Sequence, residues 1–153
     1  MHVDALAKVH LTLAVLPGML ARGTGEIINV SSAAALGPAW TNSTYGAAQA
    51  CVLAFTQSLA YSRVVRTSGV RLMALCPGSV KTEFNVRAGI PDFLTPRWRW
   101  LSSETVVNGA IRDLRRGRRM SIPSLRYKLL ALRTCTCPTV PFRFTRGILV
   151  TWH

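Results

Sequence analysis

Acidic side chains are scarce in this sequence. Six Asp and Glu stand against 19 Lys and Arg, so the formal net charge at pH 7 is +13. The imbalance is greatest from Arg112 to Arg146, where ten basic residues accompany one acidic residue, Asp113. Such a block can attract phosphate groups or anionic lipid head groups. The alternative, which we favour, is a solvated helix face followed by a basic tail.

A long apolar segment is also absent, because no run reaches the roughly 18 residues that a membrane-spanning helix needs. The stretch from Val9 to Leu20 follows Lys8 and resembles the core of a signal peptide, but Pro17 and Gly18 interrupt it. We therefore expect neither a membrane span nor a targeting signal. The use of cysteine as free thiols predicts a cytoplasmic protein.

Cysteine is too rare and too unevenly spaced for a disulfide framework. Cys51 and Cys76 lie within apolar runs, which predicts buried free thiols in a reducing compartment. Cys135 and Cys137 form a C-x-C pair with no second ligand pair beside it, whereas a closed zinc site needs four ligands. We therefore expect no metal site.

Hydrophobic residues make up 49% of the 153 residues, which is typical of one globular domain. Apolar positions recur at helical spacing in residues 1–21 and 43–66, and apolar, partly β-branched runs at residues 26–30 and 70–76 indicate buried strands. A strand, a crossover helix and a second strand predict parallel pairing in a right-handed βαβ unit.

A further helix is predicted over residues 103–116, ended by Gly117, and a short last strand over residues 120–122. Beyond this strand the periodic pattern decays. We therefore divide the chain into a partial α/β domain, residues 1–125, and a basic, irregular tail, residues 126–153.

Two hydroxyl groups mark a candidate site. Ser32 follows the first strand at its carboxyl end, the edge where open α/β sheets bind ligands, and Tyr45 stands at the start of the next helix. A serine and a tyrosine that converge there can hydrogen-bond a carbonyl oxygen, with the tyrosine as proton donor. The structural alternative is that serines often end strands and tyrosines often begin helices.

Three segments in this order and at this spacing resemble the short-chain dehydrogenase/reductase family. They are residues 25–32 (GEIINVSS), residues 45–49 (YGAAQ) and residues 76–82 (CPGSVKT). The family pattern has a serine after the strand, a Tyr-x-x-x-Lys on the helix and a Pro-Gly turn that ends in threonine. The resemblance covers about residues 1–125.

The resemblance implies an α/β fold that corresponds to the C-terminal half of a doubly wound, Rossmann-type parallel sheet. It implies an oxidoreductase that interconverts a small alcohol and a ketone with NAD or NADP as cofactor. Ser32 would bind and polarise the substrate oxygen, and Tyr45 would supply or accept the proton. Cofactor contacts carry over to Asn29, Tyr45, Gln49, Pro77, Gly78, Val80 and Thr82.

Two residues depart from the family's proton-transfer group. Gln49 stands where the family has lysine, and Asp4 stands where a preceding helix carries a supporting asparagine. Tyrosine ionises only at alkaline pH unless a neighbouring cation stabilises the phenolate. Because Gln49 supplies no charge and Asp4 favours the protonated phenol, we expect Tyr45 to be a poor base.

The glycine-rich turn of the family has no counterpart in this sequence. That turn, G-x-x-x-G-x-G, sets the pyrophosphate of the cofactor against a helix N-terminus. We therefore expect an N-terminally truncated member with a degenerate active site, impaired or inactive as an enzyme. The strand at residues 26–30 would then lie at an open sheet edge, which favours aggregation or pairing with another chain.

Two alternatives to an enzyme remain open. In the family, the helices that match residues 1–21 and 43–66 pack against a second subunit, so this chain would be an interaction fragment that forms homo- or hetero-oligomers. Core packing explains the small residues Ala47, Ala50 and Ala54 equally well. The other alternative is a basic anion-binding protein.

The run Arg97–Trp100 alternates bases with aromatic rings, as in proteins that stack on nucleic-acid bases. We prefer to interpret it as part of a substrate-side flap and do not expect a nucleic-acid partner.

Overall fold

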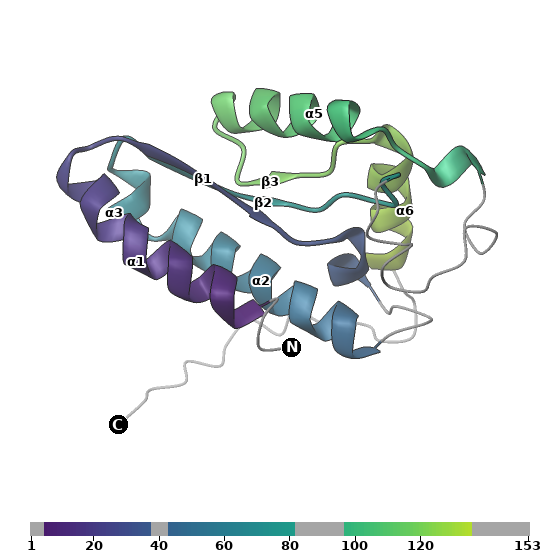
Figure 1. Cartoon of the computed structure of the whole chain (residues 1–153), viewed down its shortest axis with the longest axis horizontal. Coiled ribbons are helices and arrows are strands. Elements are labelled where there is room, and N and C mark those ends of the chain that lie inside the picture. The colour runs from purple at the N-terminus through teal and green to yellow at the C-terminus, as the bar shows by residue number, and fades with distance from the viewer. Residues whose placement is uncertain (1–4, 38–42, 82–96, 136–153) are drawn as a thin grey trace, which may run out of the picture.

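The centre of the computed structural model is a parallel sheet, and the structure describes residues 5–37, 43–81 and 97–135. All the strand pairs are parallel, as the sequence predicted, and β2 is the central strand (Figure 1). The strand order is β1 (Gly25–Val30), β2 (Val70–Leu75) and β3 (Met120–Ser121).

Helices cover both faces of this sheet. Helices lie against each of the two faces, which is the layering of a doubly wound α/β fold (Figure 1). On one face lie α1 (Ala7–Ala21), α2 (Ser43–Tyr61) and α3 (Arg63–Arg66), and on the opposite face lies α5 (Ser103–Arg115).

The alternation of side chains along β2 explains why the sheet is buried on both faces. Leu72 packs with Leu16 of α1 and Ala60 of α2, whereas the next residue, Met73, packs with Val106 of α5. Successive side chains of a strand point to opposite faces, so a continuous apolar run such as β2 needs a cover on each side.

The helix that the sequence predicted over residues 43–66 is interrupted. Ser62 has an extended ψ of 148°, and its Oγ accepts a hydrogen bond from the N–H of Val65 at 3.4 Å. The side chain therefore caps a new helix, α3, and ends the preceding one at Tyr61. The apolar spacing continues through the break, which is why the periodic pattern did not reveal it.

The irregular tail predicted from residue 126 is wrong for its first part, because residues there form a helix, α6 (Leu125–Cys135). Tyr127 is 8% exposed and belongs to a core cluster with Cys76 and Ile122, and Ala131, one turn later, packs against the same cluster. Among the residues of the helix whose side chains are described, Tyr127 and Ala131 face the core, and the basic and exposed positions around them obscured the pattern in the sequence.

The predicted burial of the cysteines holds for one of the two. Cys76 is completely buried, whereas Cys51 is exposed on α2, on the same outer surface as Ala47 and Ala54. Cys51 lies in an apolar run, but its position on the helix points it away from the sheet. Cys137 lies outside the described residues.

In the described ranges, no helix is long and apolar enough to cross a membrane. The same residues contain no group of three or more potential metal ligands.

Candidate functional site

Two chain segments continue side by side beyond the carboxyl ends of β1 and β2. The N–H of Ser31 donates to the carbonyl of Leu75 at 2.7 Å, and the N–H of Ala33 donates to the carbonyl of Pro77 at 2.8 Å. These bonds hold the serine segment against the Pro-Gly turn, at the sheet edge where ligands of open α/β folds bind.

Ser32 begins the short 3₁₀ helix η2 (Ala33–Leu36) that follows β1. Its Oγ accepts a hydrogen bond from the N–H of Ala34 at 3.2 Å, and the residue is half-buried. This cap fixes the oxygen and leaves the hydroxyl hydrogen without an acceptor among the described residues. Ser32 can therefore donate to a ligand oxygen.

The helix that carries Tyr45 is attached to the same place. Ser31 Oγ donates to the backbone carbonyl of Gln49 at 2.8 Å, which joins the end of β1 to the second turn of α2. Tyr45 lies one turn earlier on the helix and is half-buried. Residues four apart share one face of a helix, so Tyr45 and Gln49 are neighbours along α2.

Gln49 is the most unusual side chain of the site. It is 3% exposed, and its Oε1 is buried with no hydrogen-bond partner in the described part of the chain. Proteins rarely bury an acceptor without a donor, because the lost hydration is not replaced. The position therefore favours a ligand that offers a hydrogen-bond donor.

Asn29 does not join this group. Its Nδ2 donates to Thr12 Oγ1 at 3.1 Å and to Thr56 Oγ1 at 3.0 Å, and its Oδ1 accepts from Thr12 at 3.2 Å. Both amide hydrogens are therefore used to tie β1 to α1 and α2. The side chain has a structural contact where the sequence indicated a cofactor contact.

The Pro-Gly turn is held by the chain that returns after residue 96. Val80 forms a parallel bridge with Leu101, the N–H of Lys81 donates to the carbonyl of Leu101 at 3.1 Å, and the N–H of Leu101 donates to the carbonyl of Ser79 at 2.9 Å. Of the other predicted site residues, Asp4 and Thr82 lie outside the described residues.

Two residues with a part in this arrangement were not among the predicted site residues. Ser31 looks in the sequence like a duplicate of Ser32, although its hydroxyl makes the bond to α2. Tyr127 of α6 accepts a hydrogen bond from the N–H of Ser79 at 2.9 Å, but it lies in a segment with no interpretable pattern. Neither bond has a signature in local sequence.

Cys76 lies directly behind the Pro-Gly turn. Burial raises the pKa of its thiol from 9.0 to about 11, partly opposed by a hydrogen bond with Ser31. The thiol is therefore protonated at neutral pH, and a protonated thiol is a poor nucleophile. Cys76 contributes packing to the site.

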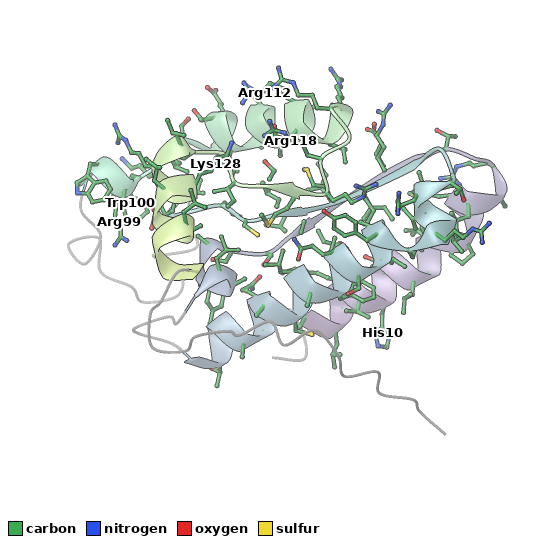
Figure 2. All side chains as sticks on the ribbon, turned by 180° about the vertical axis from the view of Figure 1, so that it is seen from behind. His10, Arg99, Trp100, Arg112, Arg118 and Lys128 are labelled. Atoms are coloured by element: carbon green, nitrogen blue, oxygen red, sulfur yellow. The ribbon has the colours of Figure 1, made fainter. Side chains whose placement is uncertain are left out.

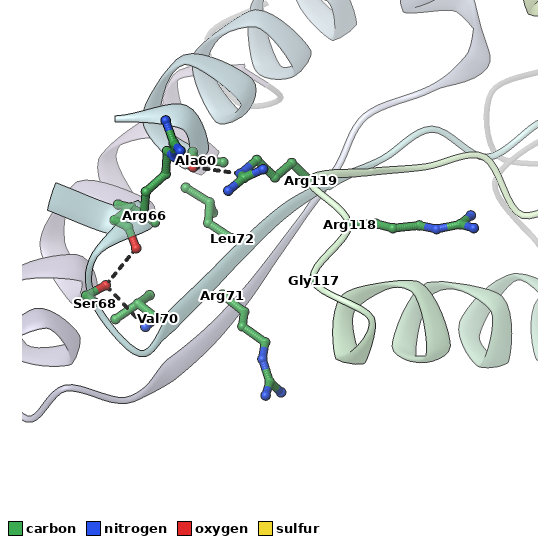
Figure 3. A pocket seen from close by; sticks show the side chains of 10 residues that line it. Ala60, Arg66, Ser68, Val70, Arg71, Leu72, Gly117, Arg118 and Arg119 are labelled. Carbon is green, nitrogen blue, oxygen red and sulfur yellow. Dashed lines mark hydrogen bonds between the residues drawn. The ribbon is translucent and has the colours of Figure 1, made fainter. Parts of the chain in front are cut away.

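A hollow lies away from these residues, toward the amino end of β2, between α3 and the turn from α5 to β3 (Figure 3). It has a volume of about 130 Å³, and its lining includes Arg66, Arg71, Arg118 and Arg119, which we call the arginine pocket. Arg71 is paired with Glu26 at 2.7 Å and Arg118 with Asp113 at 3.3 Å.

A parallel sheet with covering helices on both faces and hydroxyl groups at its carboxyl edge defines the doubly wound α/β class. Within that class, the sequence model for short chain dehydrogenases matches residues 1–90. The chain belongs to the short chain dehydrogenase family.

Individual relatives agree with this assignment. The 2-keto-3-deoxy-L-fuconate dehydrogenase of Xanthomonas campestris is 43% identical over 82 residues, which are 53% of this chain and 26% of the relative. The D-beta-hydroxybutyrate dehydrogenase of Rhizobium meliloti is 34% identical over 106 residues, 69% of this chain and 39% of the relative.

A solved short-chain dehydrogenase from Sphingobium yanoikuyae, in complex with NADPH, superimposes with a TM-score of 0.72 at 29% identity. The superposition covers 95% of this chain and 56% of that structure. The matches to these curated relatives span about a quarter to two fifths of their length.

Proposed function

We propose that this chain carries the catalytic half of an NAD(P)-dependent site for the interconversion of a small alcohol and a ketone. The observation that carries the proposal is the bond from Ser31 Oγ to the carbonyl of Gln49, because it sets Ser32 beside the helix of Tyr45. In this proposal Ser32 donates to the substrate oxygen, and Tyr45 gives the proton to that oxygen in reduction.

The cofactor fits the described residues at two points. The buried Oε1 of Gln49 has no hydrogen-bond donor among the residues that the structure describes, and a ribose hydroxyl would supply one. The Pro77–Val80 turn, with Thr82 after it, would border the nicotinamide, which supplies the hydride when bound. A solved relative is in complex with NADPH, which supports a nicotinamide cofactor.

Activity of the chain should be weak. Gln49 has no charge with which to stabilise the phenolate of Tyr45, and Asp4 would oppose its formation. Both substitutions act against the oxidation of an alcohol, in which the tyrosine must accept a proton. We therefore expect any turnover to be in the direction of ketone reduction.

The test is a titration of the purified full chain with NADH and NADPH, followed by nicotinamide fluorescence, and then a turnover assay on small ketones. Saturable binding is expected, and Tyr45→Phe should abolish turnover. Gln49→Lys should bring about turnover in the direction of alcohol oxidation, measured with small alcohols. A chain that is folded by circular dichroism but binds neither cofactor would refute the enzymatic proposal.

A second candidate function is oligomer formation. The chain would then act as an interaction fragment that binds another subunit through α1 and α2. The outer surface of α2 supports it, because Ala47, Cys51 and Ala54 are small and exposed in one stripe. Ala54→Arg should then shift the mass measured by light scattering to that of a monomer. An unchanged mass would exclude this surface.

The arginine pocket supports a third candidate, the binding of phosphate-type anions. Arg119 is held in place by a bond from Nε to the carbonyl of Ala60 at 3.0 Å and by the ring of Tyr61, 4.6 Å away. Arg66, which also lines the hollow, has no carboxylate partner in the described chain. A rigid guanidinium beside a second one suits an oxyanion.

Calorimetry with pyrophosphate at low salt tests this candidate. Arg66→Ala should abolish binding, and Arg112→Ala should not, since Arg112 is an exposed residue of α5 that does not line the pocket (Figure 2). The absence of binding by the unmodified chain at low salt would rule the candidate out, because screening is weakest there.

A further inference from the structure

The hydroxyl group of Tyr127 connects two segments that are far apart in the sequence. It accepts a hydrogen bond from the N–H of Ser79 at 2.9 Å and donates one to the carbonyl of Arg99 at 3.0 Å. The residue is 8% exposed. A tyrosine in a core commonly needs one partner for its hydroxyl, whereas here both its donor and its acceptor function are used on the backbone.

The ring of Tyr127 fixes the same turn by contact. A Cβ atom added to Gly78 would overlap the ring, so the turn approaches the aromatic face as closely as a backbone can. Gly78 does not have a positive φ, and other residues could adopt its backbone conformation. Its lack of a side chain is therefore needed for packing on Tyr127.

A neighbouring residue of α6 reinforces the connection. Arg126 Nη1 donates to the carbonyl of Trp98 at 2.9 Å, one residue before the carbonyl that Tyr127 binds. The first turn of α6 thus holds residues 98–99, while the bridge between Val80 and Leu101 joins this segment to the turn. Together these contacts close a frame around residues 77–80.

We propose that Tyr127 is a positioning residue, which sets the place of the Pro77–Val80 turn and through it the surface on which the nicotinamide would lie. The role in placing the nicotinamide rests on the proposed function, whereas the positioning of the turn does not. Tyr127 would act without touching substrate or cofactor, through the Ser79 amide and the Gly78 contact. The helix α6 then helps to hold the site in place.

The experiment compares the full chain with Tyr127→Phe, which keeps the ring and removes both hydrogen bonds. Amide exchange measured by NMR reports on Ser79, and NADH titration reports on the site. Tyr61→Phe is the matched control, because the Tyr61 hydroxyl makes no hydrogen bond in the described chain and the residue is 57% exposed. Val65→Ala, in the cluster at the other end of β2, controls for general loss of stability.

Tyr127→Phe should accelerate exchange at Ser79 about fivefold or more, the factor expected for one lost hydrogen bond, and leave the amides of β1 unchanged. NADH affinity should fall in the same variant, and neither control should reproduce this pattern. Unchanged exchange at Ser79 would overturn the proposal whether or not NADH binds.

Other outcomes separate the two parts. Faster exchange at Ser79 with an unchanged NADH affinity would overturn the role in cofactor placement. Faster exchange in a chain whose unmodified form binds no NADH would support the positioning of the turn and count against the proposed function.

Discussion

The substitution Gln49→Leu should make the protein more stable and its cofactor binding weaker. Gln49 is 3% exposed, and its Oε1 has no donor in the described chain. Leucine has a similar size and no polar atoms, so it removes the buried acceptor without opening a large cavity. A residue that only supports the fold would lose stability when its polar group is removed.

The size of the gain follows from the missing hydrogen bond. An unsatisfied buried polar group costs about 1–3 kcal/mol, and some of the gain is lost to imperfect packing of the leucine. We therefore expect the free energy of unfolding to rise by roughly 1–2 kcal/mol in urea titration. For a domain of this size, Tm should rise by about 2–8 °C.

Gln57→Leu provides the control on the same helix. Gln57 is half-buried, and its Nε2 donates to the sulfur of Met120 at 3.5 Å, so its removal should give no gain in stability. A loss of stability in both variants would show that Gln49 Oε1 has a partner in solution, and the argument from an unpaired acceptor would fail. If the unmodified chain binds NADH, Gln49→Leu should weaken this binding and Gln57→Leu should leave it unchanged.

Three further predictions concern the surroundings of the site. Gly78→Ala should lower the free energy of unfolding by about 1–3 kcal/mol, because the added methyl group overlaps the Tyr127 ring. Most of this loss should vanish in a Tyr127→Ala background. Additive losses in the double-mutant cycle would contradict the contact. Burial raises the pKa of Cys76 to about 11, so the folded state holds the thiol proton more tightly than the unfolded state does. The free energy of unfolding should therefore fall by up to ~3 kcal/mol as pH rises from about 9 to about 11. Cys76→Ala should lack that component in urea titrations across this range, and an identical pH profile would show that the thiol does not contribute. Thr56→Val should cost about 1–3 kcal/mol in urea unfolding, because it takes a hydrogen-bond acceptor from the buried amide of Asn29, and Thr56→Ser should cost less if the hydroxyl is what matters.

Much of the fold could be predicted from local patterns. The strands at Gly25–Val30 and Val70–Leu75 lie within one residue of their predicted ends, and the parallel pairing follows from the crossover helix between them. Apolar runs and helical spacing were sufficient because both signals are properties of neighbouring residues. The break at Ser62 and the helix α6 were missed because their signals are weak or masked by basic residues.

The arrangement of the candidate site could also be predicted in part, because the motifs are properties of neighbouring residues. Motif spacing placed Ser32, Tyr45 and the Pro-Gly turn at one edge, and the hydrogen bonds from Ser31 and Ala33 hold that edge together. Asn29 is the contrasting example. The family resemblance implied a cofactor contact for it, but Thr12 and Thr56 come from helices on either side of it in the chain and take up its amide.

By itself, the sequence determined the family, the strand–helix–strand order and the residues that carry hydroxyl groups, because these depend on residue types and their spacing. Only the tertiary structure decided which polar groups are satisfied and which are not. Gln49 has a buried oxygen for which residues 5–37, 43–81 and 97–135 offer no hydrogen-bond donor. Tyr127, from a segment with no readable pattern, binds the turn of Gly78. Hydrogen bonding between distant segments depends on packing in three dimensions, and no local pattern in a single sequence encodes it.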